Sequence, residues 1–304
     1  MSPMDTGDRP VFLLGLGAQK TGTSWLHDYL QAHEQCATGF TKEYHILDGL
    51  YVPQMKFFRD RTAERFERVA ARKPKAKAKA KKSDNAAYKE ALTQRHRFYN
   101  DVSSYFDYFA GLATSNGARL AADITPTYMT LPPEALQQTV QEMQARGVDT
   151  RLIFIMRDPV DRLWSAVRMA RRNARIKNPD GTFDLSEADA VRKSYTAPLQ
   201  DIRGRYEQTL RAVEAAGLRD QTQFVFFEEM FNEDWLRGFC DFARIRYEPA
   251  DFSKRVNASP GTDALPQELV QRIVHHHRDT YQAVAQSFGT ERLRRLWPNM
   301  ELLQ

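Results

Sequence analysis

Cysteine is scarce in this chain: only Cys36 and Cys240 occur among 304 residues, far apart and outside any CxxC pattern. Two isolated cysteines supply neither a disulfide framework nor a cysteine zinc site. Long apolar runs are also missing, since no stretch approaches the roughly 18 consecutive apolar residues that span a bilayer. The first ten residues, MSPMDTGDRP, lack the apolar core of a secretory signal. These absences argue against a disulfide scaffold and a membrane-spanning chain, and we expect a soluble cytoplasmic protein.

Positive charge is concentrated in one run. Residues 72–82, RKPKAKAKAKK, hold seven cationic side chains and no acid, and without them the formal net charge falls from +5 to −2. A nucleic-acid-binding domain usually spreads its cations over a folded face with aromatic residues among them, so we expect no nucleic-acid partner. The composition of this run favours a solvated insertion. The alternative is peripheral contact with an anionic polymer or with an anionic membrane, at its inner face.

The rest of the sequence is typical of a globular protein. Apolar residues make up 42% of the chain, with 18 Phe, 12 Tyr and 4 Trp, which is enough for a sizeable core. No internal repeat and no linker divides it. We therefore predict a single domain over residues 1–304, with a basic, low-complexity, disordered insertion at 72–90.

Two segments have the pattern of a buried strand followed by a loop and a helix. The first strand is VFLLGLG at 11–17, and the second is RLIFIM at 151–156. After the second strand, Asp158 can cap the next helix and Pro159 suits its first turn. Strands that alternate with helices indicate a mostly parallel sheet covered on both faces. Other predicted elements are strands at 120–124 and 223–227, helices near 201–216 and about 266–288, a helical or irregular region at 50–115, and a polar loop at 183–196.

The loop after the first strand, GLGAQKTGTSW, is rich in glycine and leads into a helix. Backbone N–H groups and the positive end of a helix converge in such a loop and bind anions. A Rossmann fingerprint would need a third glycine at Lys20, and a Walker A motif would need glycines at Leu14 and Gln19. Both standard nucleotide loops therefore fail at defining positions. Lys20 and residues 22–24 at a helix start still describe a phosphate cradle.

Four segments together resemble the sulfotransferases that use 3′-phosphoadenosine 5′-phosphosulfate (PAPS). QKTGTSWL resembles their 5′-phosphosulfate loop, and LIFIMRDPVDRLWSAVRM resembles their 3′-phosphate motif. TKEYH at 41–45 and DITPTY at 123–128 resemble stretches of the heparan sulfate sulfotransferase branch, so the motif pattern is nearest to that branch, in a soluble, bacterial-like form. The resemblance implies a P-loop-like, three-layer α/β/α fold with a mainly parallel central sheet. It also implies transfer of a sulfuryl group from PAPS, which leaves adenosine 3′,5′-bisphosphate.

The same resemblance implies which residues hold PAPS. Lys20 would neutralise the leaving phosphate as the S–O bond breaks. Arg157 and Ser165 would hold the 3′-phosphate, because arginine suits a bidentate phosphate contact. Residues 256–262 stand where a C-terminal cofactor loop is expected, through Ser259 and Gly261. The 5′-phosphosulfate would lie against Lys20, Thr21, Gly22, Thr23 and Ser24. Trp25, which follows this cradle, would either border the nucleotide or pack the helix.

Glu43 is the general base that the resemblance implies. The acceptor hydroxyl or amine must lose its proton while it attacks sulfur, and a carboxylate whose pKa is raised by partial burial can take that proton near neutral pH. His45 is the alternative base, because its ordinary pKa is closer to 7. If residues 41–45 are extended, Glu43 and His45 face the same side and Lys42 points away.

The acceptor is left open by the sequence. A hydroxyl or amine of a small molecule, a glycan or a lipid headgroup fits the proposed chemistry. The heparan sulfate branch tends to carry a basic residue where Ile124 stands, and its disulfide-bearing loop has no counterpart here, so a long anionic polysaccharide is not favoured. Acceptor pockets in such folds are built from variable loops, which here are residues 50–115 and 172–200.

Two other functions remain as alternatives, and no catalytic metal is expected. A nucleotide-dependent kinase would need an acid at a strand end to hold Mg²⁺, for which Asp123 is the candidate. A non-catalytic nucleotide or polyanion binder would use the basic run. The run His275-His276-His277 cannot all face one metal ion from a helix, because successive residues turn by about 100°.

Overall fold

A five-stranded sheet forms the centre of the computed structural model, which describes residues 9–71, 82–178, 185–253 and 264–303. The strand order is β2-β3-β1-β4-β5, and every neighbouring pair is parallel. The predicted parallel α/β sheet is confirmed, and the short strand β2 is an addition to the prediction. The strands are β1 (Val11–Gly17), β2 (Cys36–Ala37), β3 (Leu120–Ile124), β4 (Asp149–Met156) and β5 (Thr222–Phe226).

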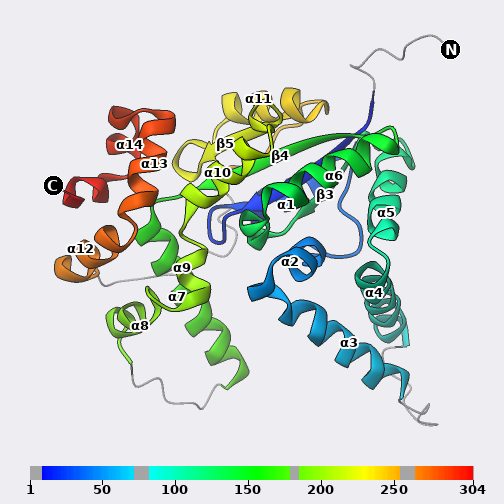
Figure 1. The fold of residues 1–304 in the computed structure, drawn as a ribbon, viewed down its shortest axis with the longest axis horizontal. Helices are drawn as coiled ribbons and strands as arrows, with labels where there is room; N and C mark the ends of the chain where they lie inside the picture. The colour runs from blue at the N-terminus through cyan, green and yellow to red at the C-terminus, as the bar shows by residue number, and fades with distance from the viewer. Residues whose placement is uncertain (1–8, 72–81, 179–184, 254–263, 304) are drawn as a thin grey trace.

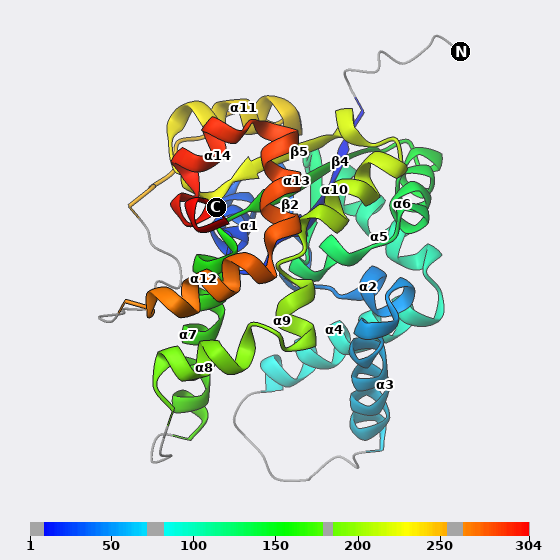
Figure 2. The same ribbon diagram turned by 60° about the vertical axis from the view of Figure 1, so that its left-hand side comes forward.

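Helices cover both faces of this sheet (Figures 1 and 2). Successive residues of β1 point to opposite faces, so Phe12 and Leu14 enter one buried cluster while Val11 and Leu13 enter another. The first cluster includes side chains of α5 (Ser103–Thr114), α6 (Pro133–Ala145), α10 (Tyr206–Ala215) and α13 (Arg278–Phe288). The second includes side chains of α1 (Thr23–Ala32) and α11 (Glu233–Ala243). The predicted three layers are therefore present.

The remaining helices lie around the edges of these layers. In both views α3 and α4, and likewise α7 and α8, extend away from the sheet. Since β1, β3 and β4 run in parallel, their carboxyl ends meet at one edge, and the loops that carry the sequence motifs start there. The helices around the edges are α2 (Ile46–Tyr51), α3 (Phe57–Ala70), α4 (Lys82–Asn100), α7 (Pro159–Lys177), α8 (Glu187–Ser194), α9 (Pro198–Ile202), α12 (Gln267–His276) and α14 (Thr290–Leu296).

Several predicted elements need correction. Residues 82–90 of the predicted disordered insertion are helical and belong to α4, whereas residues 72–81 lie outside the described residues. The predicted loop at 183–196 contains α8, because Ser186 caps this helix by accepting a hydrogen bond from the backbone N–H of Asp189. The single helix predicted at 266–288 is interrupted at His277, where the backbone leaves helical geometry between α12 and α13.

The helix predicted near 201–216 is also divided. Its first part belongs to α9, and α10 starts only at Tyr206, with Gly204 in the turn between them. The predicted start of α7 is correct, since Asp158 Oδ1 accepts a 2.8 Å hydrogen bond from Val160 N and Pro159 is the first helical residue. Among the described residues, no helix combines the length and apolarity needed to cross a bilayer.

Candidate active site

The loop between β1 and α1 forms the predicted phosphate cradle. Gly22 precedes α1 with a φ of 91°, where other residues are strained, and a Cβ at this position would lie 2.8 Å from Sδ of Met230, so glycine is favoured here. Thr21 Oγ1 donates a 2.7 Å hydrogen bond to the carbonyl of Ala18, which closes the loop. The N–H groups of the first turn of α1 are available to an anion there.

Lys20 lies in this loop with its Nζ 3.7 Å from Sδ of Met169 on α7. Burial lowers the pKa of Lys20, and the charges of Arg172, Arg157 and Lys42 lower it further. A lysine among other cations is stabilised when an anion binds, so the cluster favours a phosphate or sulfate at this place.

The second phosphate motif contacts the first. Arg157 follows β4, and its NH1 donates to the carbonyl of Lys20 at 3.4 Å. Its guanidinium lies over the ring of Phe227, 4.5 Å from the ring centre, and its Nε is buried without a hydrogen-bond partner in the described chain. Ser165 is half-buried two turns into α7. Ser259 and Gly261 lie outside the described residues.

Trp25 is placed differently from the other predicted PAPS ligands. Its side chain is only 6% exposed and packs against Tyr29, Phe231, Trp235 and Phe252. These contacts join α1 to α11 in the second core cluster. Trp25 is therefore a packing residue, and this geometry gives no support to a contact with PAPS.

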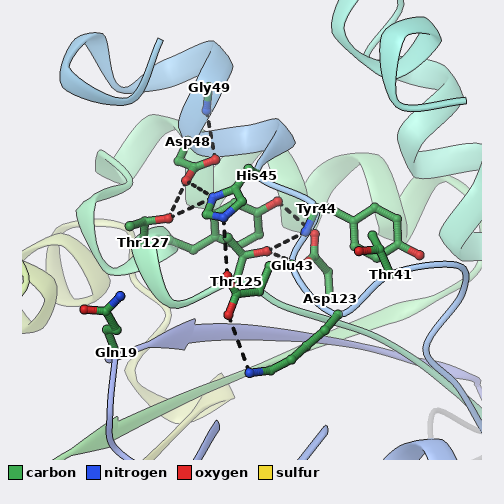
Figure 3. A network of polar contacts seen from close by, with 12 residues as sticks. Gln19, Thr41, Glu43, Tyr44, His45, Asp48, Gly49, Asp123, Thr125 and Thr127 are labelled. Atoms are coloured by element: carbon green, nitrogen blue, oxygen red, sulfur yellow. Dashed lines mark hydrogen bonds and ion pairs between the residues drawn. The ribbon is translucent and has the colours of Figure 1, made fainter. Parts of the chain in front are cut away.

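The segment that carries Glu43 lies beside the cradle (Figure 3). Oε2 of Glu43 is 3.5 Å from Nε2 of His45, so these two side chains do face each other, as predicted. The expected direction of Lys42 is wrong: its Nζ donates a 2.6 Å hydrogen bond to Oγ of Ser24 and lies 3.5 Å from Oε1 of Glu43. The chain bends at Lys42 and has a φ of 59° at His45, so the alternation of an extended strand does not apply.

Asp48 is a member of this group that sequence reasoning missed. It is fully buried, and its Oδ2 lies 2.9 Å from Nδ1 of His45. Thr127 Oγ1 donates to the same oxygen at 2.5 Å, and the N–H of Gly49 donates to Oδ1 at 2.9 Å. Figure 3 shows the imidazole between the two carboxylates. An acid three residues after a histidine, at the start of a helix, was the only signal in the sequence.

The imidazole of His45 has little freedom to move. Its ring stacks on Phe58 of α3, with the ring centres 3.6 Å apart and the planes 11° from parallel. Asp48 and Thr127 fix one nitrogen, so the other points to Glu43. The ring orientation is thus set from three sides.

The electrostatics of Glu43 differ from the prediction. Burial raises the pKa of the Glu43 carboxyl, but the hydrogen bond from His45 and the charge of Lys42 outweigh it, and the pKa lies below its usual value. Burial lowers the pKa of His45, yet Asp48 and Glu43 outweigh that effect and leave it raised. The predicted raised pKa of Glu43 is therefore wrong, because it considered burial without the neighbouring cations.

The motif at 123–128 holds the Glu43 segment in place. Asp123 at the end of β3 accepts 2.8 Å hydrogen bonds from Tyr105 and Tyr128 on Oδ2 and a 2.7 Å bond from Thr125 on Oδ1. Burial raises the pKa of Asp123 to about 6. Thr125 Oγ1 in turn accepts the N–H of Tyr44 at 3.0 Å. The segments 41–45 and 123–128, which the sequence analysis singled out, are therefore parts of one hydrogen-bond network.

Helix α4 supports the same segment from the other side. Arg95 NH2 donates to the backbone carbonyl of Glu43 at 3.0 Å, and the hydroxyl of Tyr99 donates to that of His45 at 2.5 Å. The region 50–115 thus contributes regular helices, rather than only loops, next to the proposed base.

A second group of polar residues lies between α9 and α12. Within the described residues, Asp201, His276 and His277 are close enough to hold a metal ion. However, Asp201 Oδ1 already lies 2.6 Å from Nε2 of His276 and 2.8 Å from NH2 of Arg205. A cation would have to displace that guanidinium, with the charge of buried Arg162 acting against it.

Comparisons with known proteins agree with this geometry. The model of the "Sulfotransferase family" matches residues 10–249. A solved sulfotransferase from Alicyclobacillus acidocaldarius is 19% identical over 91% of this chain and 94% of its own, with a TM-score of 0.54. This likeness supports a P-loop-like fold of the sulfotransferase kind.

Two further structures are more distant. The sulfotransferase domain of the curacin biosynthetic pathway has 14% identity and a TM-score of 0.45, with coverage of 83% of this chain and 80% of that one. The sulfotransferase domain of the Synechococcus PCC 7002 olefin synthase has 14% identity and a TM-score of 0.43. The match covers 90% of this chain and 97% of that one. No curated protein sequence matches the chain. These comparisons do not support the heparan sulfate branch that the sequence motifs indicated.

Proposed function

Because this chain belongs to the sulfotransferase family, we propose that it transfers the sulfuryl group of PAPS to a hydroxyl or amine of an acceptor. The acceptor classes are a small molecule, a glycan or a lipid headgroup. The reaction forms an O–S or N–S bond to the acceptor, breaks the S–O bond of PAPS, and releases a proton and adenosine 3′,5′-bisphosphate.

One observation carries this proposal. The phosphate cradle and the candidate base are joined by Lys42, whose Nζ reaches both Ser24 at the start of α1 and Glu43. The leaving phosphate of PAPS, held in the cradle, would therefore lie next to this ammonium. The acceptor hydroxyl or amine, which gives its proton to Glu43, would lie next to it as well. Sulfuryl transfer needs that arrangement, with the attacking and leaving atoms on opposite sides of sulfur.

The residues present fit PAPS as co-substrate. Lys20 and Lys42 provide positive charge at the loop, and Gly22 keeps a side chain out of it. Arg157 has a buried Nε without a partner in the described chain, which a phosphate oxygen would satisfy. We assign the 5′-phosphosulfate to residues 20–24 and the 3′-phosphate to Arg157 and Ser165.

Glu43 is the proposed base, with His45 and Asp48 as its support. The carboxylate is ionised near neutral pH, and its side chain is 40% exposed, so an acceptor can reach it. The imidazole, held by Asp48, orients Glu43 and keeps its carboxylate ionised until it takes the proton of the acceptor. Lys20 and Lys42 stabilise the negative charge that develops on the leaving phosphate, an interaction that strengthens in the transition state. His45 as the base itself is the alternative.

The kinase alternative needs a free acidic side chain for Mg²⁺, and its candidate is not free in this arrangement. Asp123 was the candidate Mg²⁺ ligand, but both its oxygens accept hydrogen bonds from hydroxyl groups, and the side chain is fully buried. The basic run of the polyanion-binding alternative lies, except for Lys82, outside the described residues.

Isothermal titration calorimetry tests the function. We expect adenosine 3′,5′-bisphosphate to bind without added metal, and ATP with Mg²⁺ to bind much more weakly. The reverse preference would contradict the sulfotransferase proposal and favour a kinase. Incubating cell extracts with isotopically labelled PAPS, followed by mass spectrometry, would then identify the acceptor by its labelled sulfuryl group.

A further inference from the structure

Arg203 is a charged side chain near the active site that the proposed mechanism does not use. It directly follows α9 and is half-buried. Its NH1 donates to Oε1 of Gln19 at 3.3 Å, and Gln19 is the residue before Lys20 in the phosphate loop. Its Nε is buried without a hydrogen-bond partner in the described chain, and no described carboxylate lies within 4.0 Å of the guanidinium.

This state is unfavourable for a guanidinium. Arginine carries five N–H donors and a charge that it keeps at all physiological pH values. Among the described residues, the guanidinium of Arg203 makes one weak hydrogen bond, to the neutral side-chain amide of Gln19. Burial also removes part of the hydration of the guanidinium. A buried charge without an ion-pair partner is destabilising unless a ligand supplies the missing acceptor atoms.

The position of Arg203 indicates which ligand this is. The charges of Glu43 and Asp48 act on Arg203, but both acids have closer cationic partners in Lys42 and His45. Arg203 therefore contacts the phosphate loop and lies within electrostatic reach of the proposed base. The phosphates of PAPS already have Lys20, Lys42 and Arg157 in the proposed arrangement, whereas the acceptor must approach Glu43.

We infer that Arg203 binds an acidic group of the acceptor, a carboxylate or a phosphate or sulfate ester, placed near the hydroxyl or amine that is sulfated. The inference rests on the proposed function and narrows its acceptor class. One guanidinium provides one anion site, so it selects an acceptor with a single nearby acidic group rather than a long polyanion. Oxygen atoms of such a group match the fork of the guanidinium.

Inorganic sulfate is a suitable probe, because it carries the same kind of oxygen atoms. The protein is first saturated with adenosine 3′,5′-bisphosphate and then titrated with sulfate in a calorimeter. We expect one further sulfate to bind to the unmodified protein, and the Arg203→Gln variant to bind it about 10- to 100-fold more weakly. Arg203→Lys, which keeps the charge without the fork, is expected to lie between them. Arg192→Gln, an exposed change on α8, is the matched control and should bind normally.

A second titration separates the acceptor from the transferred group. With PAPS in place of the bisphosphate, the sulfuryl position is filled. Sulfate binding that persists and still depends on Arg203 supports an acceptor site. Sulfate binding that disappears shows that Arg203 serves the transferred sulfuryl group, and overturns the inference.

Two further outcomes are distinguishable. If the bisphosphate binds but sulfate does not, the inference fails while the proposed function stands. If the bisphosphate does not bind, the proposed function fails. The inference fails as well, because it rests on that function. Bisphosphate affinity of Arg203→Gln within a few-fold of the unmodified protein confirms that the variant is folded.

Discussion

Lys42 Nζ lies 2.6 Å from Ser24 Oγ, and this hydrogen bond connects the segment of the proposed base to the first turn of α1. The same ammonium is 3.5 Å from Glu43. One side chain therefore links the two halves of the proposed reaction, and its charge affects both the cofactor loop and the ionisation of the carboxylate.

Replacing Lys42 should impair catalysis more than cofactor binding. In Lys42→Met the stabilising charge near the leaving group is lost, so we expect kcat to fall by about 10²-fold or more, the range for losing one transition-state donor. The affinity for adenosine 3′,5′-bisphosphate, measured by calorimetry, should fall by less. Lys42→Arg keeps the charge and is the control. Unchanged kcat in Lys42→Met would contradict the role given to this residue.

Glu43→Gln should nearly abolish turnover without affecting the cofactor site. Loss of a general base typically costs about 10²- to 10⁴-fold in rate, and Glu43 is not a proposed ligand of PAPS. We expect the bisphosphate affinity to stay within a few-fold, as measured by calorimetry beside steady-state kinetics. Near-normal turnover in Glu43→Gln together with loss of turnover in His45→Ala would move the base to His45.

The dependence of kcat/KM on pH separates the same two assignments. Glu43 has a pKa below its usual value of 4.5, so as the base it stays ionised and activity should persist below pH 6.5. His45 has a pKa above its usual 6.5, so as the base it would lose activity as pH falls through that raised value. A profile recorded between about pH 5 and 8 distinguishes these outcomes. An acidic limb that disappears in His45→Asn would assign the base to the imidazole.

Arg157→Ala should weaken binding of the bisphosphate. Removing a charge-assisted phosphate contact is expected to make the free energy of binding less favourable by roughly 2–4 kcal/mol. Calorimetry measures it directly. Arg192→Ala, which removes an exposed arginine from α8, is the matched control and should bind with normal affinity. Equal affinities of the two variants would show that Arg157 does not hold the 3′-phosphate.

Asp158 predicts a change of stability with pH. Burial raises its pKa to about 7, whereas in the unfolded chain it stays near 3.8. The native state therefore binds more protons between these values, and this group makes the protein less stable as pH rises from about 4 to 7. An asparagine side chain at this position can also cap α7 but does not ionise. Urea unfolding should show Asp158→Asn gaining stability relative to the unmodified protein from pH 5 to pH 8.

An exposed acid provides the comparison for that measurement. Asp220→Asn removes a charge from the surface and should show no such trend. If Asp158→Asn and the unmodified protein differ by the same amount at both pH values, Asp158 ionises in the native state as it does in the unfolded chain, and its assigned pKa is wrong.

The sequence predicted the features of this molecule that depend on neighbours along the chain. β1 with its glycine loop, β4 with the Asp158 cap, and the parallel sheet all follow from local apolar runs and turn residues. The direction of Lys42 does not follow from an alternating strand, because the backbone bends there.

Features that depend on distant contacts were not predictable in this way. The pKa of Glu43 is lowered rather than raised because Lys42 and His45 outweigh burial. These two residues are close to Glu43 in the sequence, but the bend of the chain at Lys42 decides where their side chains point. Asp48 contacts His45 directly and is also held by Thr127, which the fold brings from the segment after β3. Arg203 gains its position through Gln19, which is 184 residues away along the chain. The contacts made by Thr127 and Gln19 follow from the fold, and no spacing along the sequence contains them.

The support that α4 gives to the Glu43 segment has a consequence for protein engineering. Arg95 and Tyr99 hold the carbonyls of Glu43 and His45, while Phe58 of α3 stacks on the imidazole. A designer who remodels these two helices to admit a new acceptor would also shift the backbone that aims the proposed base. Libraries for altered acceptor preference should therefore keep these three side chains fixed and vary the helix positions that face away from the segment.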